Sequence, residues 1–221
     1  MTNNQMLLYE ETKKLPEFFS PLDLTKVFET IQNSTNYLKN DWGEFMRYRD
    51  KSIVACIYFL AARPKEICCL RFDDFDLENL TVKIRGENNK QKKDRILPIP
   101  QQILPYLKDF FAFDRFRFWK GSQYLFPSLE NPHISTGRLK HIFREKILKP
   151  AGLWKPAINS TVPPYRAYTL RHTRLSQIYN ETKDIFLVAN TAGHSHLSSS
   201  KVYVHTDKNY LEYMREKLNK N

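Results

Sequence analysis

Four residues in this chain have types and an order that suit attack on a phosphodiester: Arg63, Arg171, His194 and Tyr203. The non-bridging oxygens of a phosphodiester gain negative charge as the phosphorus becomes pentavalent, and the planar guanidinium of arginine holds two such oxygens at once. A tyrosine hydroxyl can attack the phosphorus, and the phosphotyrosine ester keeps the energy of the broken bond for resealing. The set predicts cutting and rejoining of DNA through Tyr203, with no need for a metal or another cofactor.

The basic excess of the chain favours a polyanionic partner. Its 221 residues include 35 Lys and Arg but only 24 Asp and Glu, which gives a formal net charge of +11. Each basic group that docks on a phosphate releases condensed counterions, so this charge favours double-stranded DNA. Charge alone leaves a merely soluble basic protein about equally plausible. The length suffices for one good core, or for one core and a small appendage.

The cysteines and the start of the chain bear on the cell compartment. Cys56, Cys68 and Cys69 lie in apolar stretches with no His or Cys at zinc-ligand spacing. They are typical of small buried hydrophobes in a reducing compartment. No segment approaches the length of a membrane span, and residues 1–5 lack the apolar stretch of a signal peptide. We therefore expect a cytoplasmic, nucleoid-associated protein.

The elements that must position these residues are mostly helical. Ser20 and Pro21 are typical of a helix start, and residues 80–85 and 95–99 alternate apolar and polar side chains, which predicts a β-hairpin. The fold class that follows is mainly α with a small antiparallel β-sheet (α+β). The other helices are expected over residues 50–60, 67–70, 103–118, 136–149, 170–180 and 184–191.

Both ends of the chain differ in character from its middle. Residues 1–19 read as a polar N-terminal arm, and residues 20–206 as one domain. Residues 207–221 form a helical tail in which Leu211, Met214 and Leu218 make an apolar stripe. The ordinary interpretation of such a stripe is packing against its own domain.

Five segments also resemble, in order, the motifs of one known family. From about residue 22 to 206, the chain resembles the catalytic domain of the tyrosine recombinases, the phage-integrase and Xer-like family, which implies that fold. The intervals between the segments also agree with the family. The segments are Ala62-Arg63-Pro-Lys-Glu66, Lys90-Gln-Lys-Lys-Asp-Arg-Ile-Leu-Pro98, Leu170-Arg171-His172-Thr173, Ala192-Gly193-His194-Ser195 and Lys201-Val-Tyr203-Val-His205.

The resemblance assigns further roles. It implies that Lys90, at the hairpin tip, protonates the departing sugar oxygen, and that Glu66 helps to hold Arg63. Lys92 and Lys93 share the tip of Lys90 and compete with it, and we assign them to DNA binding.

Histidines and tyrosines near the motifs have competing interpretations. His172 is interpreted as structural, because a histidine at the start of a helix more often forms a hydrogen bond with a neighbouring loop than takes part in catalysis. Tyr210 and Tyr213 lie near Tyr203, but their neighbours do not match the nucleophile segment. The resemblance also implies self-association as a tetramer on DNA. In that case the tail, residues 207–221, would dock on a neighbouring protomer, which is the alternative to packing against its own domain.

Two departures from the family pattern stand out. Tyr168 occupies the position where the family usually has His or Lys, and a phenol keeps its proton at neutral pH and shuttles protons poorly. Deprotonation of Tyr203 would then depend on the arginines, on His194 or on water. The family also usually carries a DNA-binding domain before the catalytic one, so the chain is either a catalytic fragment or a naturally minimal protein.

Three function classes remain open at this point. The leading one is a site-specific recombinase or integrase that works through a 3′-phosphotyrosine intermediate. A type IB topoisomerase would use the same chemistry but reseal the same strand. A catalytically weakened DNA-binding member of the fold is the third, and Tyr168 is its only support.

Overall fold

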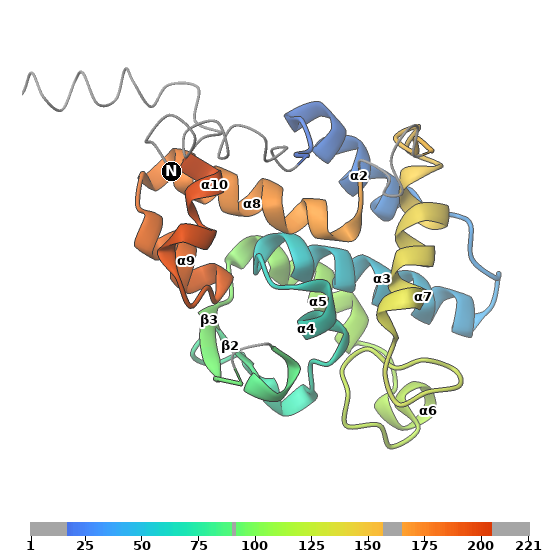
Figure 1. The fold of residues 1–221 in the computed structure, drawn as a ribbon. Coiled ribbons are helices and arrows are strands. Elements are labelled where there is room, and N and C mark those ends of the chain that lie inside the picture. Colours follow the sequence, from blue (N-terminus) through green and yellow to red (C-terminus); the bar gives the residue numbers. More distant parts are fainter. Residues whose placement is uncertain (1–16, 90–91, 157–164, 205–221) are drawn as a thin grey trace, which may run out of the picture.

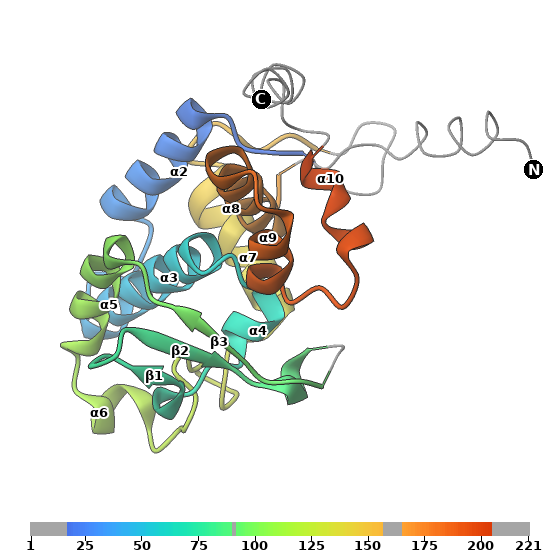
Figure 2. The same cartoon turned by 90° about the vertical axis from the view of Figure 1, so that its left-hand side faces the viewer.

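The helices and the sheet of this protein are arranged around one long central helix. A computed structural model describes residues 17–89, 92–156 and 165–204 (Figure 1). Helix α3 (Asp41–Phe59) runs through the middle, with α2 (Pro21–Asn33) and α8 (Ala167–Thr182) on one side and the sheet on the other (Figures 1 and 2). The predicted fold class, mainly α with a small antiparallel sheet, is confirmed.

The sheet has three strands, one more than the predicted hairpin. β2 (Thr81–Ile84) pairs antiparallel with β3 (Arg95–Pro98), so that Thr81 lies opposite Pro98 and Ile84 opposite Arg95. β1 (Phe75–Asp76) adds to the other edge of β2. A strand of two residues has no alternation to detect, which is why the pattern predicts only β2 and β3.

The helix starts follow their capping residues. The Ser20 hydroxyl accepts from the Asp23 N–H at 3.1 Å, as expected for α2. Helix α3 begins well before the predicted residue 50, because the Asn40 side chain caps it by accepting from the Gly43 N–H at 2.9 Å. Every residue from Arg49 to Tyr58 is buried, which agrees with the central position of this helix.

Two predicted helices are interrupted. The predicted helix 103–118 is α5 (Leu104–Phe111) followed by α6 (Arg115–Trp119), and Pro105 lies in the first turn of α5, where its missing N–H has no cost. The predicted helix 136–149 is α7 (Thr136–Ile142) continued by a π-helical turn, Phe143–Leu148. The other α-helices of the described residues are α4 (Pro64–Cys68), α9 (Ile185–Ala192) and the short α10 (Lys201–Val204).

The core consists of a large cluster around α3 and a small one at the C-terminal helices. The small cluster consists of Ala61, Leu175, Tyr179, Val188, Ala192 and Tyr203. It joins the end of α3 to α8, α9 and α10, which lie together in both views (Figures 1 and 2). The small cluster therefore fixes the surroundings of Tyr203.

The predicted arm and tail lie largely outside the described residues. At the end of the arm, Phe19 is buried in the large cluster, and its N–H donates to the Thr173 hydroxyl at 3.0 Å. Residues 1–16 and the tail, with its stripe of Leu211, Met214 and Leu218, lie outside the described part of the chain. In the part that is described, every helix is too short or too polar to span a bilayer.

Candidate active site

The predicted site residues come from four segments that are distant in the sequence and adjacent in the fold. Arg63 precedes α4, Arg171 lies on α8, His194 follows α9, and Tyr203 lies on α10. Their meeting depends on the sharp chain reversal after α3, where Ala61 has a left-handed backbone with φ of 47°. Figure 2 shows α4 beside the C-terminal helices.

Arg63 is held from two sides. Its Nη1 donates to Glu66 Oε1 at 3.0 Å, and its Nη2 donates to the Gly193 carbonyl at 3.3 Å. The Arg63 main-chain N–H also donates to Glu66 Oε2 at 2.8 Å, which closes the first turn of α4. The side chain keeps 26% of its surface exposed, so Arg63 reaches solvent at the edge of the site.

Glu66 is a fully buried carboxylate that also binds a second arginine, Arg95. Arg95 donates from Nη1 and Nη2 to the two Glu66 oxygens, at 2.9 and 2.7 Å. Burial acts to raise the pKa of Glu66, but the hydrogen bonds and charge of Arg95, and then of Arg63, outweigh it and lower the pKa. Glu66 therefore stays ionised and fixes both guanidinium groups.

Sequence reasoning missed Arg95, although a signal was present. In β3, Arg95 lies on the same face as Leu97, which is buried, whereas Ile96 and Pro98 are exposed. An arginine on the inward face of a strand needs a buried acidic partner.

Arg171 is fully buried in the described structure. Its Nη1 donates to the Ala61 carbonyl and its Nη2 to the Ala192 carbonyl, each at 2.7 Å. Among the described residues no partner bonds its Nε. These contacts join the end of α3, α8 and the end of α9 at a single side chain, so Arg171 organises the site as well as carrying charge.

His194 lies just beyond the end of α9. Gly193 ends this helix with φ of 60°, and the His194 N–H donates to the Ala189 carbonyl at 2.9 Å. His194 Nδ1 lies 2.8 Å from the hydroxyl of Ser200, which is buried. Burial, together with the charges of Arg171, Arg63 and Arg95, lowers the pKa of His194 to about 4. The ring is therefore neutral at pH 7.

Tyr203 is only 1% exposed, and its hydroxyl lies 3.0 Å from His172 Nδ1. Burial raises the pKa of Tyr203 well above its usual value, against the opposing charges of Arg171 and Arg63. Burial and the charges of Arg171, Arg166 and His194 lower the pKa of His172 to about 4. A neutral imidazole beside a protonated phenol means that the hydroxyl donates and Nδ1 accepts.

His172 is thus placed at the hydroxyl of the predicted nucleophile and not against a loop. The residue type and position in the motif carry no sign of this contact, because it depends on how the short helix α10 folds back on α8. Tyr168 lies one helical turn before His172, and the two rings meet edge to face with centroids 4.8 Å apart. The Arg171 guanidinium carbon lies 5.9 Å from the Tyr168 ring centroid.

The structure describes only some of the site residues predicted at the hairpin tip. Lys90 lies outside the described residues. The side chains of Lys92 and Lys93 are exposed beside β3, and Lys92 has a left-handed backbone with φ of 51°. The structure therefore brings together Arg63, Glu66, Arg171, His194, Tyr168 and Tyr203, and leaves Lys92 and Lys93 at the surface.

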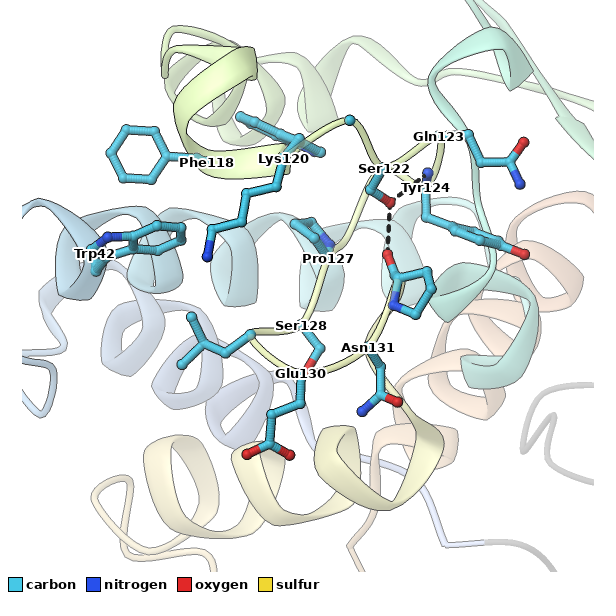
Figure 3. A pocket seen from close by; sticks show the side chains of 14 residues that line it. Trp42, Phe118, Lys120, Ser122, Gln123, Tyr124, Pro127, Ser128, Glu130 and Asn131 are labelled. Carbon is cyan, nitrogen blue, oxygen red and sulfur yellow. Dashed lines mark hydrogen bonds between the residues drawn. The ribbon is translucent and has the colours of Figure 1, made fainter.

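Two hollows of similar size lie on the described surface, and only one borders these residues. A hollow of about 730 Å³ between α4, α7 and the start of α8 is lined by Arg63 and Tyr168, and has Lys65, Lys140 and Arg166 among its other residues. A hollow of about 770 Å³ lies instead between α6 and residues 127–132, where Trp42 and Lys120 face it (Figure 3). It contains none of the predicted site residues, so the candidate site is at the first hollow.

This arrangement suits the stabilisation of negative charge beside a phenol. Two arginines and the neutral His172 lie close to Tyr203, the neutral His194 contacts the nearby Ser200, and basic side chains line the adjacent hollow. In the described state the Arg171 and Tyr203 side chains are closed to solvent, whereas Arg63 is open. A phosphate can therefore meet Arg63 first, and Arg171 and Tyr203 only after a local rearrangement.

Comparisons with known proteins identify the relatives of this chain. Residues 26–210 match the model of the phage integrase family. The tyrosine recombinase XerC of Thermodesulfovibrio yellowstonii is 29% identical over 204 residues, which cover 90% of this chain and 61% of that protein. The chain thus spans about three fifths of the length of the curated relatives it matches.

Solved structures agree with this relationship. The XerH site-specific recombinase in a post-cleavage complex with a palindromic difH substrate superposes with a TM-score of 0.71 at 25% identity, covering 94% of this chain and 54% of that one. The catalytic domain of the bacteriophage HP1 integrase has the same fold, with a TM-score of 0.56 at 20% identity, covering 91% of this chain and 94% of that domain.

Proposed function

Because this chain belongs to the phage integrase family, we propose that it catalyses site-specific DNA recombination, cleaving and rejoining strands through a 3′-phosphotyrosine bond on Tyr203. The observation that carries this proposal is that segments distant in the sequence meet at Tyr203: Arg63 and Arg171 lie near enough for their charges to act on its hydroxyl, and His194 contacts Ser200, whose carbonyl accepts from the Tyr203 N–H. Double-stranded DNA is the proposed partner, which accords with the net charge of +11 and with the basic hollow beside Arg63.

Each site residue has a proposed role. Arg63 and Arg171 bind the non-bridging oxygens of the scissile phosphate, and His194 donates a hydrogen bond to the same group. Glu66 holds Arg63 in place, and Tyr168 lines the phosphate site at the position where relatives carry His or Lys. Lys90 protonates the leaving oxygen. Lys92 and Lys93 contact the DNA backbone.

The reaction that these roles describe conserves bond energy. Tyr203 Oη forms a bond to phosphorus as the bond from phosphorus to the 5′ oxygen breaks, and the 5′ oxygen leaves as a hydroxyl with the proton of Lys90. A 5′-hydroxyl from a second duplex then attacks the phosphotyrosine, and Tyr203 is released. Exchange between duplexes requires several protomers on DNA, so we propose a tetramer, in which residues 207–221 dock on a neighbouring protomer.

The proposal is tested by trapping the covalent intermediate without assuming a DNA site. A nicked duplex with randomised arms lets the short 5′-hydroxyl fragment diffuse away after cleavage, so that the adduct accumulates. At low salt, the wild-type protein should form an adduct that survives denaturing electrophoresis and carries a 5′-end label on the DNA. Sequencing the trapped DNA then gives the preferred site.

The matched variant is Tyr203→Phe, which removes only the hydroxyl. It should bind the same DNA and form no adduct, a loss of more than about 10³-fold expected from removal of the nucleophile. An adduct with Tyr203→Phe, or an adduct that keeps a 3′-end label and not the 5′-end label, would contradict the proposal.

A further inference from the structure

The contact between His172 and Tyr203 indicates where the proton of the nucleophile goes. We propose that His172 is a catalytic residue that accepts the Tyr203 hydroxyl proton through Nδ1 as Tyr203 attacks the phosphate, an inference that rests on the proposed function above. The two atoms lie 3.0 Å apart, within the reach of direct proton transfer. His172 therefore takes the place in the reaction that Tyr168 fills poorly.

The geometry of the pair is fixed by packing on both sides. The Tyr203 ring belongs to the small C-terminal cluster, and its hydroxyl meets His172 on α8. The imidazole contacts two further aromatic side chains, with Tyr168 at 4.8 Å and Phe18 at 6.4 Å between ring centroids, both edge to face. This packing restrains the ring, so that Nδ1 remains directed at the nucleophile.

The other candidate bases are less well placed. His194 Nδ1 is engaged by the Ser200 hydroxyl at 2.8 Å. Arg63 and Arg171 carry no lone pair that accepts a proton. Tyr168 is a phenol like the nucleophile itself, so transfer from Tyr203 to Tyr168 gains nothing. Among the described residues, His172 is the neutral nitrogen base in hydrogen-bond contact with the Tyr203 hydroxyl.

The charges around His172 link its basicity to the phosphate. Arg171 and Arg166 on or beside α8, and His194 beyond α9, are the titratable groups that lower the pKa of His172, after burial. Tyr203 faces it from α10, and Phe18, from the segment before α2, is uncharged. A DNA phosphate bound to the arginines neutralises part of their charge, so the His172 pKa rises when substrate is present. The base then becomes stronger at the moment it is needed.

The cleavage step moves two protons, one from Tyr203 and one to the 5′ oxygen. The Oη–H bond of Tyr203 breaks, its proton binds His172 Nδ1, and its oxygen forms the bond to phosphorus while the 5′ oxygen leaves with a proton from the hairpin lysine. In rejoining, the 5′-hydroxyl gives its proton back to the neutral hairpin lysine as it attacks phosphorus, and the imidazolium returns the other proton to the departing Tyr203 oxygen. Each strand exchange therefore restores His172 to its neutral form.

Two variants separate proton transfer from positioning. His172→Gln keeps a hydrogen-bond acceptor near Tyr203 but cannot take up a proton at neutral pH, and His172→Ala leaves space for free imidazole. In single-turnover adduct formation on the trapped substrate, we expect His172→Gln to be at least about 100-fold slower than wild type. Imidazole added to His172→Ala should raise the rate at least about tenfold, in proportion to its neutral form.

The pH profile adds a signature that a structural role would not produce. The wild-type rate should fall as acid protonates His172, and this acid limb should be absent in His172→Gln. His133→Gln is the matched control: this ring contacts Tyr124 and the Ile134 carbonyl, away from the site, and its rate should equal wild type. Melting temperature and DNA affinity of each variant identify any folding defect.

A measurement without DNA checks the contact itself. Nitrogen NMR of the histidine rings should show Nδ1 of His172 as the unprotonated nitrogen, with a resonance that moves in Tyr203→Phe while that of His133 does not. If wild-type protein forms an adduct and His172→Gln forms it at the same rate with the same acid limb, the role of His172 is overturned and the proposed function stands. If wild-type protein forms no adduct on any trapped sequence, the proposed function itself fails, and the role of His172 with it.

Discussion

Glu66 is the residue on which most of the site geometry depends. It is fully buried and accepts hydrogen bonds from both Arg63 and Arg95, so the three side chains form one network. Arg63, Glu66, Arg171, His194 and Tyr203 could be predicted from residue types and motif order. Arg95 and His172 could not be assigned in this way, because their contacts join segments whose relative positions only the fold determines.

The network makes a prediction for Arg95. Arg95→Met removes one of the two arginine partners of a buried carboxylate, and because Arg63 alone then compensates its charge, the free energy of unfolding should fall by about 3 kcal/mol. Arg117→Met is the matched control, because the Arg117–Asp41 pair is exposed and should contribute about 0–1 kcal/mol. Urea unfolding measures both. Equal losses in the two variants would show that the Glu66–Arg95 pair is not a buried unit.

The elements differ in how far the sequence determines them. Helices α2 and α9 could be predicted because capping residues and apolar side chains agree there, whereas α8 begins three residues before its predicted start, after Arg166, whose side chain makes no capping hydrogen bond. The break between α5 and α6 could not be predicted, because residues 112–114 contain neither glycine nor proline to mark the end of a helix. Helix α10 is four residues long, too short for any periodic signal, yet it carries Tyr203.

The end of α9 is an element that the site requires in one backbone conformation. Gly193 has φ of 60°, and a Cβ added there would lie 3.1 Å from the Arg95 guanidinium. Gly193→Ala should therefore lower the free energy of unfolding by about 1–2 kcal/mol, and should slow adduct formation by displacing Arg95.

Gly137→Ala is the control for this prediction. Gly137 lies in α7 with only Ser135 Oγ, at 3.8 Å, near an added Cβ, so alanine should be neutral or stabilise by about 1 kcal/mol. Urea unfolding compares the two variants. An unchanged stability in Gly193→Ala would mean that the turn after α9 relaxes without cost.

At the scale of the whole molecule, the fold concentrates basic groups around two half-buried neutral histidines, His172 and His194. The pKa of His172 and the pKa of His194 are each about 4 in the folded protein, below the ordinary value of 6.5. The unfolded chain therefore binds more protons than the folded one between pH 6.5 and 4. The stability that these rings contribute is present above pH 6.5 and is lost as the pH falls through this window.

This linkage predicts acid sensitivity in a range where carboxylates remain ionised. Between pH 7 and pH 5, the free energy of unfolding should fall by about 1 kcal/mol for each ring, after allowance for the solvent that still reaches them. Urea unfolding at the two pH values measures the fall, and His172→Gln should make it smaller. A fall of the same size in His172→Gln would show that this ring does not titrate as described.

The covalent bond to Tyr203 is the central claim, and mass spectrometry of the trapped adduct tests it most directly. Digestion of the adduct with nuclease and trypsin should leave nucleotide attached to the peptide 202–208, in which Tyr203 is the single tyrosine. Tyr168 lies in the peptide 167–171, and Tyr210 and Tyr213 both lie in 209–215, so the mass of the modified peptide distinguishes Tyr203 from all three. Nucleotide on the 202–208 peptide is the predicted result, and nucleotide on either of the other two peptides would contradict the assignment of the nucleophile.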